Sequence, residues 1–186
     1  MFQILRLIIF LAGIALVYFF WEWNGAKLLS DALHSPATVN AQLVGTLAPD
    51  LKIPKEQMRN KQEFLLKDRK GQAVIVHFWA TWCEPCREEM PAMQRLEKRF
   101  AGRPFTILAV NVGEGEARIQ EFLDKSALQL TVLRDHSSVA MKAWRARGLP
   151  ASYVVGADGR VRYSHTGELN WDDERLIALL ARELPK

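Results

Sequence analysis

Apolar residues occur along the chain in short runs that alternate with stretches of helical spacing. Residues 73–79 (AVIVHFW) form a continuous apolar, β-branched run, typical of a strand buried on both faces. In residues 83–100 the apolar positions recur at helical spacing, and Gly102 is a stop signal. The pattern therefore predicts a buried strand that leads directly into a helix.

The same alternation continues toward the C-terminus. It predicts a strand at 105–110, a helix at 116–128, a strand at 130–133, a helix at 137–146 and strands at 152–155 and 160–164. The last two flank Ala157-Asp158-Gly159, a hairpin turn signal. Asn170 is expected to cap a final helix whose apolar face includes Leu176 and Leu180. Alternating strands and helices that end in a hairpin predict a three-layer α/β sandwich with a mixed sheet.

The N-terminal segment has a different character. Residues 7–21 carry no charge, and with residues 2–5 the apolar stretch approaches the roughly 20 residues needed to cross a bilayer. The aromatics Tyr18 and Trp23 stand near its end, where no small-residue cleavage site follows, so a retained anchor is favoured over a cleaved signal peptide. Arg6 weakly favours an N-terminus inside and an exported domain. We expect an anchor at 1–23, a linker at 24–42 and a folded domain at 43–186.

Composition narrows the class of protein. Of 186 residues, 49% are hydrophobic and 25% are charged, which is globular rather than disordered. The net charge of +4 is spread along the chain, and acidic residues interrupt its densest basic stretch, 52–70. That stretch is typical of a solvated surface, so no nucleic-acid partner is expected.

The chain has two cysteines, Cys83 and Cys86, at the predicted start of the helix. Free amide N–H groups and the helix dipole stabilise a thiolate there, which lowers the pKa of Cys83. Cys86 lies one turn further on and can close a disulfide, while Pro85 costs little in a first helical turn. We expect Cys83 to be the exposed attacking thiolate and Cys86 to resolve the mixed disulfide. Structural zinc needs four ligands, and the scattered histidines complete no such site, so no metal is predicted.

The segments FWATWCEPC, REEMP and GLPASYVV resemble the thioredoxin superfamily. They are most similar to the membrane-anchored TlpA/ResA group of extracytoplasmic thiol–disulfide oxidoreductases, some of which serve cytochrome c maturation. The resemblance runs from about Val44 to Leu184. It implies a thioredoxin-like fold in which Pro150 is a cis-proline that faces the cysteines; an ordinary trans turn proline is the alternative.

The resemblance also indicates where this chain is distinctive. Pro150 comes 64 positions after Cys86, which leaves room for a strand–helix insertion at 116–133. Ala151 and Ser152 stand where relatives often carry threonines, and the loop typical of the CcmG branch is absent. The predicted substrate-binding residues are Trp82, Glu84, Pro85, Leu149 and Pro150. Trp79 and Trp82 are expected to pack around the motif.

Glu89 matches the acidic position of the TlpA/ResA pattern. It lies three and six residues past the cysteines, on their helical face, where a carboxylate could shuttle the proton of thiol–disulfide exchange. The alternative is a solvent-facing glutamate, which is the interpretation we give to Glu88. His77, inside the apolar strand, is interpreted as a satisfied core or edge histidine.

These features predict a reductase of disulfides in exported proteins, with apocytochromes c as candidate clients. Glu84 places a negative charge beside Cys83, which disfavours the thiolate and argues against a strong oxidant. No cofactor is expected beyond the redox-active Cys83–Cys86 pair, and resemblance implies a membrane electron donor of the CcdA/DsbD type. The expected location is the bacterial inner membrane, single-pass, with the domain on the periplasmic side. The alternatives are a disulfide-introducing oxidase, a thiol peroxidase and a copper metallochaperone.

Overall fold

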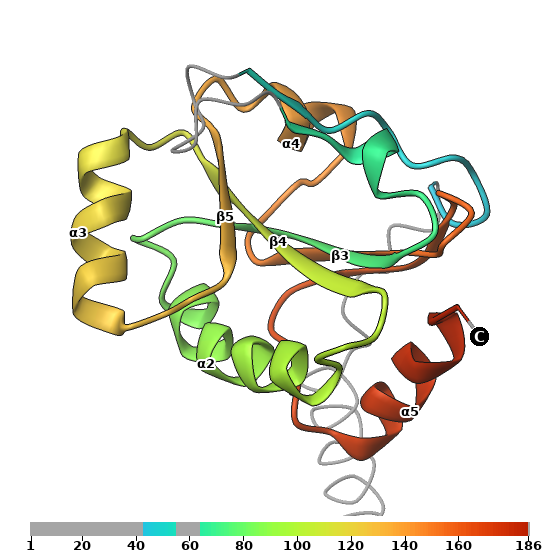
Figure 1. Ribbon diagram of the computed structural model, residues 1–186. Helices are drawn as coiled ribbons and strands as arrows, with labels where there is room; N and C mark the ends of the chain where they lie inside the picture. Colours follow the sequence, from blue (N-terminus) through green and yellow to red (C-terminus); the bar gives the residue numbers. More distant parts are fainter. Residues whose placement is uncertain (1–42, 55–63, 186) are drawn as a thin grey trace, which may run out of the picture. The chain divides into compact units, whose positions relative to one another are not determined.

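A five-stranded mixed sheet forms the centre of the domain (Figure 1). The computed structural model describes residues 43–54 and 64–185. The strands are β3 (Ala73–Trp79), β4 (Phe105–Val112), β5 (Thr131–Asp135), β6 (Ala151–Val155) and β7 (Val161–Thr166), in the spatial order β5-β4-β3-β6-β7. Strand β3 is parallel to β4 and antiparallel to β6. The central strand of the sheet therefore leads into the cysteine motif.

Helices cover both faces of this sheet (Figure 1). They are α2 (Glu84–Arg99), α3 (Glu116–Ser126), α4 (Val139–Ala143) and α5 (Glu174–Glu183). Residues from α2, α3 and α5 share one apolar cluster, whereas α4 belongs to the cluster on the opposite face. The short strands β1 (Lys52–Ile53) and β2 (Phe64–Leu65), with the 3-10 helix η2 (Leu66–Arg69), also belong to this opposite cluster.

Strand β3 is buried along its whole length because helices or loops pack on both of its faces. Alternate residues feed the two clusters: Ile75 and Trp79 point toward α2, and Val76 and Phe78 point the other way. His77 therefore shares the α2 face of the sheet with Ile75 and Trp79. The sequence-based prediction of an α/β fold with a mixed sheet is confirmed.

The order and type of the predicted elements agree with the structure, but two details were wrong. Asp173, not Asn170, caps the last helix, because its carboxylate accepts hydrogen bonds from the amides of Arg175 and Leu176 at 2.7 and 3.4 Å. Asn170 instead accepts from the amide of Asp172 in a preceding turn. The helix predicted at 137–146 is limited to α4, because Ser138 and Arg145 both adopt left-handed backbone conformations.

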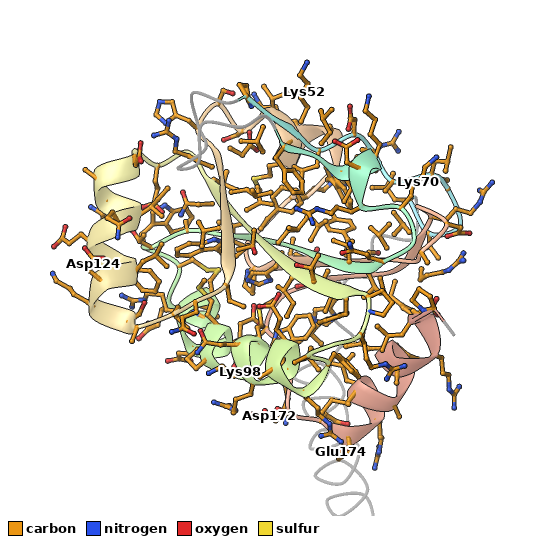
Figure 2. The ribbon with its side chains drawn as sticks, in the orientation of Figure 1. Lys52, Lys70, Lys98, Asp124, Asp172 and Glu174 are labelled. Atoms are coloured by element: carbon orange, nitrogen blue, oxygen red, sulfur yellow. A yellow bond between two sulfur atoms is a disulfide. The ribbon has the colours of Figure 1, made fainter. Side chains whose placement is uncertain are left out.

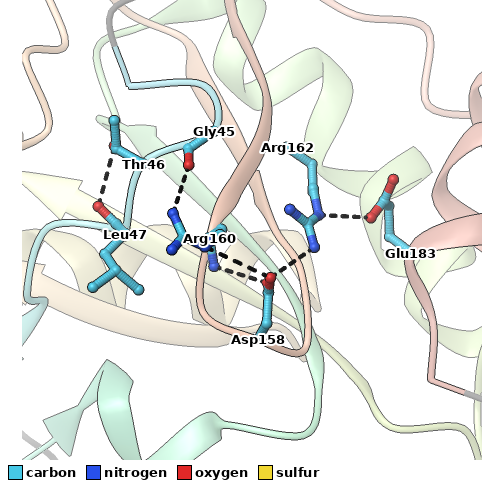
Figure 3. A network of polar contacts seen from close by, with 7 residues as sticks. All are labelled: Gly45, Thr46, Leu47, Asp158, Arg160, Arg162 and Glu183. Carbon is cyan, nitrogen blue, oxygen red and sulfur yellow. Dashed lines mark hydrogen bonds and ion pairs between the residues drawn. The ribbon is translucent and has the colours of Figure 1, made fainter.

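The hairpin turn between β6 and β7 is tied to distant segments by charged side chains (Figure 3). Arg160 donates to the carbonyl oxygen of Gly45 at 2.8 Å. Arg162 donates to Asp158 within the turn and to Glu183 of α5, at 2.9 and 3.1 Å. These contacts fix the predicted Ala157-Asp158-Gly159 turn against both the N-terminal part of the domain and its last helix.

Two bidentate ion pairs at the surface join α2 to the start of α5 and to the segment that precedes it. Arg95 binds Asp172, and Arg99 binds Glu174; Figure 2 labels both acidic residues. All four side chains are at least half exposed, so water screens these pairs and they add little to stability. They do show how the segment that precedes α5 is held beside α2.

The predicted anchor and linker, residues 1–42, lie outside the described residues. Among the helices that the structure describes, none is long and apolar enough to cross a bilayer.

Candidate active site

The cysteine motif lies where the central strand ends and a helix begins. Cys83 is the N-cap residue of α2, and Cys86 lies in the first turn. Their sulfur atoms are joined in a disulfide, with an S–S distance of 2.06 Å and a Cα–Cα distance of 5.3 Å. Residues at the N-cap and in the first turn adjoin helix amides that lack internal partners. A thiolate formed at Cys83 on reduction would therefore meet a favourable electrostatic environment.

Access to the disulfide is uneven. Cys83 retains 5% of its surface and Cys86 none, so the expectation of an exposed Cys83 was wrong for the oxidised form. The reason is that both cysteines belong to the apolar cluster formed with Trp79 and Met90. Cys83 remains the more accessible of the two sulfur-bearing residues.

The residues around the motif divide into a buried support and an exposed rim. Trp79 is fully buried and packs against Phe122 of α3, with 5.2 Å between ring centroids. Trp82 is 64% exposed, so the expectation that it packs around the motif was wrong. Glu84 and Pro85 are also exposed. These three residues form a partly apolar surface next to Cys83.

Pro150 immediately precedes β6, and the Leu149–Pro150 peptide bond is cis. Ala151 pairs with Phe78 in the antiparallel register of β6 and β3. Pro150 therefore lies at the end of the sheet from which the cysteine motif emerges. Leu149 is half buried and packs against both apolar clusters. The predicted cis bond is confirmed, whereas client binding by Leu149 and Pro150 stays a prediction.

Glu89 is buried beneath the motif, with 4% of its surface exposed. Its Oε2 accepts hydrogen bonds from the Leu169 amide at 3.0 Å and from Trp171 Nε1 at 2.9 Å. Burial raises the pKa of Glu89 to about 7, although these two hydrogen bonds partly oppose the rise. The solvent-facing alternative is therefore wrong for Glu89, while its neighbour Glu88 is exposed as expected.

His77 lies beside this carboxyl group on the same face of the sheet. Its Nε2 is 3.4 Å from Oε1 of Glu89, and its Nδ1 is 2.9 Å from the hydroxyl oxygen of Ser152. Complete burial lowers the pKa of His77 to about 3, so the ring is neutral at ordinary pH. The contact between His77 and Glu89 is therefore a polar contact with a neutral imidazole ring and not an ion pair.

A second buried carboxylate, Glu114, supports the loop that precedes Cys83. It accepts hydrogen bonds from the amide and the hydroxyl of Thr81 at 2.6 and 2.5 Å and from Asn111 Nδ2 at 2.7 Å. Arg118 lies 3.0 Å away. Burial would raise the pKa of Glu114, but the bonds from Thr81 and Asn111 and the charge of Arg118 outweigh it and lower the pKa.

Sequence reasoning missed two of these groups. The residues around Glu114 in the sequence do not indicate that its side chain binds Thr81, which lies 33 residues earlier in the chain. Sequence reasoning also missed the buried surroundings of Glu89, because Leu169 and Trp171 are 80 and 82 residues away in sequence. In the described part of the chain, no three His, Cys, Asp or Glu side chains gather as a metal site requires.

A buried cysteine pair where the central strand of a five-stranded sheet leads into a helix, with a cis-proline at the same end of the sheet, is the arrangement of a thioredoxin-like thiol–disulfide oxidoreductase. The chain matches the AhpC/TSA family model over residues 44–164 and belongs to that family. It is 32% identical over 133 residues to thiol-disulfide oxidoreductase ResA of Geobacillus thermodenitrificans, a match that covers 72% of this chain and 75% of that protein.

Two further relatives agree with this assignment. Thioredoxin-like protein YneN of Bacillus subtilis is 30% identical over 164 residues, which covers 86% of this chain and 90% of YneN. The crystal structure of a thiol:disulfide interchange protein of the thioredoxin family from Chlorobium tepidum is 27% identical, with a TM-score of 0.61 over 73% of this chain and 95% of that one. The protein is thus a ResA-like thiol–disulfide oxidoreductase, and disulfides in proteins are its class of substrate.

Proposed function

We propose that this protein is an extracytoplasmic reductase, anchored in the bacterial inner membrane, that reduces disulfides in exported proteins. The observation that carries the proposal is the Cys83–Cys86 disulfide at the start of α2, with exposed Trp82 and Pro85 beside it. A client polypeptide bound on this rim would bring its disulfide to the more accessible sulfur.

The proposed reaction begins with the reduced enzyme. The Cys83 thiolate attacks one sulfur of the client disulfide, which breaks that bond and releases the other client sulfur as a thiolate. Cys86 then loses its proton and attacks Sγ of Cys83, which releases the second client thiolate and forms the Cys83–Cys86 disulfide. Two electrons pass to the client, whose two thiolates take up two protons. The enzyme disulfide is the state seen in this structure.

Glu89 is the proposed proton acceptor for Cys86. Both side chains lie on the buried face of α2, three residues apart, so they are neighbours on adjacent turns. A group with a pKa of about 7 exchanges protons readily at neutral pH. An ionised Glu89 would take the proton from the Cys86 thiol as that sulfur attacks.

The charge at the motif supports the proposed direction of electron flow. Glu84 is exposed in the first turn of α2, directly after Cys83. Its negative charge disfavours the Cys83 thiolate, whereas strong oxidants stabilise theirs. A membrane protein of the CcdA/DsbD type is the proposed electron donor, and apocytochromes c are proposed clients.

The reduction potential of the full-length chain tests this direction. We expect a value nearer to about −270 mV, as in thioredoxin, than to about −120 mV, as in the strong oxidant DsbA. A value near the latter would reverse the assignment to a disulfide-introducing oxidase. Turnover of hydrogen peroxide at the rate of client reduction would instead identify a thiol peroxidase, and tight copper binding by the reduced protein would identify a metallochaperone.

Topology is tested separately. If residues 1–23 are retained as an anchor, full-length protein is expected in the membrane fraction, with its domain open to protease only from the exported side. Mass spectrometry of the purified protein reports the N-terminus directly. Recovery of a soluble product that begins near Gly25 or Ala26 would show a cleaved signal peptide instead.

A further inference from the structure

A row of polar side chains crosses the face of the sheet that packs against α2. His77 of β3 pairs in register with Ser152 of β6, and Ser152 pairs with His165 of β7. Directly paired residues of antiparallel strands point to the same face. One end of this row is Glu89, which approaches His77 from α2. Apolar residues dominate the remainder of this face, so the row requires a physical explanation.

The contact between His77 and Glu89 leaves one atom of each group in an unusual position. Nε2 of His77 and Oε1 of Glu89 are fully buried, and neither has a hydrogen-bond partner among the residues the structure describes. They face each other at 3.4 Å. Buried polar atoms without partners are costly, and a proton between these two atoms would satisfy both. A small movement of either side chain would form a hydrogen bond between Nε2 of His77 and Oε1 of Glu89.

We infer that His77 is a positioning residue for proton exchange at Glu89, and that it matches either protonation state of that carboxyl group by exchanging its two neutral tautomers, with Ser152 completing the hydrogen bond. This inference rests on the proposed role of Glu89 in thiol–disulfide exchange. His77 has one proton in both states and acquires no net charge.

The proton count in each state follows from the donors and acceptors. When Glu89 is protonated on Oε1, it donates to an unprotonated Nε2, and the Nδ1–H of His77 donates to the oxygen of Ser152. When Glu89 is ionised, Oε1 accepts from Nε2–H, and the Ser152 hydroxyl donates to Nδ1. A hydroxyl group is both donor and acceptor, so Ser152 serves both arrangements. The second state holds one proton fewer, namely the proton that Glu89 has given up.

Several titratable groups face this row from the surrounding elements. At the start of α2, Cys83 and Cys86 form a disulfide and do not titrate in the oxidised protein. On the segment before α5, Glu168 raises the pKa of Glu89 through its charge. On β7, His165 is half buried, burial lowers its pKa, and its Nε2 lies 3.2 Å from the carbonyl oxygen of Glu168. Strand β6 contributes Ser152, which does not titrate. His77 is fully buried. Exchange between its two neutral tautomers therefore costs far less free energy than forming a positively charged ring there.

The experiment is NMR of the oxidised full-length chain labelled with ¹⁵N in its histidines. The two nitrogen shifts of an imidazole ring distinguish the Nδ1–H tautomer, the Nε2–H tautomer and the doubly protonated cation. We expect the ratio of the two His77 tautomers to change by at least about tenfold between pH 5 and pH 9, around the pKa of Glu89, with no cation formed. His136, which lies outside the row, is the internal reference.

Two substitutions give opposite expectations. In Glu89→Gln the amide N–H₂ donates to Nε2 as a protonated Glu89 would, so His77 is expected to hold the Nδ1–H tautomer at every pH. In Ser152→Ala an Nδ1–H would have no acceptor, which favours Nε2–H and shifts the tautomer change to lower pH. Ser126→Ala, which removes a hydroxyl from α3 that donates to the Leu123 carbonyl, is the matched control and is expected to leave the His77 profile unchanged.

A His77 tautomer that stays constant across this range in the wild type would overturn the inference, as would a doubly protonated ring that appears near pH 7. Failure of the proposed function is distinguishable from this. If Glu89→Gln leaves the rate and pH profile of client reduction unchanged, Glu89 has no role in exchange, although the tautomers of His77 still follow its titration.

Discussion

Replacing Cys83 with serine is expected to abolish reduction of protein disulfides, whereas replacing Cys86 is expected to trap clients on the enzyme. The reason is that Cys83, at the N-cap of α2, is the more accessible of the two cysteines, while Cys86 is fully buried. Without Cys83 no mixed disulfide forms. Without Cys86 the mixed disulfide forms but has no internal thiol to resolve it.

The measurement is insulin reduction by the pre-reduced full-length variants, beside non-reducing gels of cells that express them. Cys83→Ser should fall to the uncatalysed rate, and Cys86→Ser should give high-mass bands that disappear with reductant. The double variant, Cys83→Ser with Cys86→Ser, should show neither activity nor bands. Wild-type reduction by Cys83→Ser, or client bands from Cys83→Ser and not from Cys86→Ser, would mean that the two roles are assigned in the wrong order.

The fold could be predicted because its determinants are local in sequence. The apolar run of β3, the helical spacing of α2 and the Asp158-Gly159 turn each indicate their own structure without reference to distant residues. The N-cap of the last helix was predicted wrongly because two polar residues, three positions apart, could each serve as the cap. Asn170 and Asp173 are both acceptable caps, and only the path of the chain after β7 decides between them.

The cysteines of the site could be predicted for the same reason, but their surroundings could not. Helical spacing placed Glu89 on the face of the cysteines, yet its pocket is built by Leu169 and Trp171 from the far end of the domain. His77 looked like an ordinary core residue because one strand gives no information on what packs above it. The exposure of Trp82 was also missed, since an aromatic residue beside an apolar strand is more often buried than not.

Removing the titratable proton of Glu89 should slow exchange and change its pH dependence. Glu89→Gln keeps the shape of the side chain, and its amide oxygen still accepts from Leu169 and Trp171. General acid–base catalysis typically contributes about a hundredfold or more to the rate, so we expect client reduction to slow by about tenfold or more. The Cys83 thiol should titrate at lower pH, because a negative neighbour is gone.

Alkylation of reduced Cys83 as a function of pH, in wild type and variant, measures the second effect, and insulin reduction measures the first. Glu88→Gln is the matched control, since Glu88 lies next in the helix but is exposed; it should behave as wild type. Superimposable alkylation profiles and equal rates for all three proteins would reduce Glu89 to a structural residue.

The free energy of unfolding should decrease as the pH rises and Glu89 loses its proton. The pKa of Glu89 rises from 4.5 to about 7 on folding, so the folded state favours the protonated form. Its stabilising contribution is complete below pH 4.5 and is lost as the pH rises through 7, by at most about 3 kcal/mol. Glu89→Gln has no titratable group at this position and should therefore lack this contribution to the pH dependence. Urea unfolding of the oxidised proteins at pH 5 and pH 8 should therefore show wild type losing stability relative to the variant; a constant difference would mean that Glu89 titrates in the folded protein as it does in the unfolded chain.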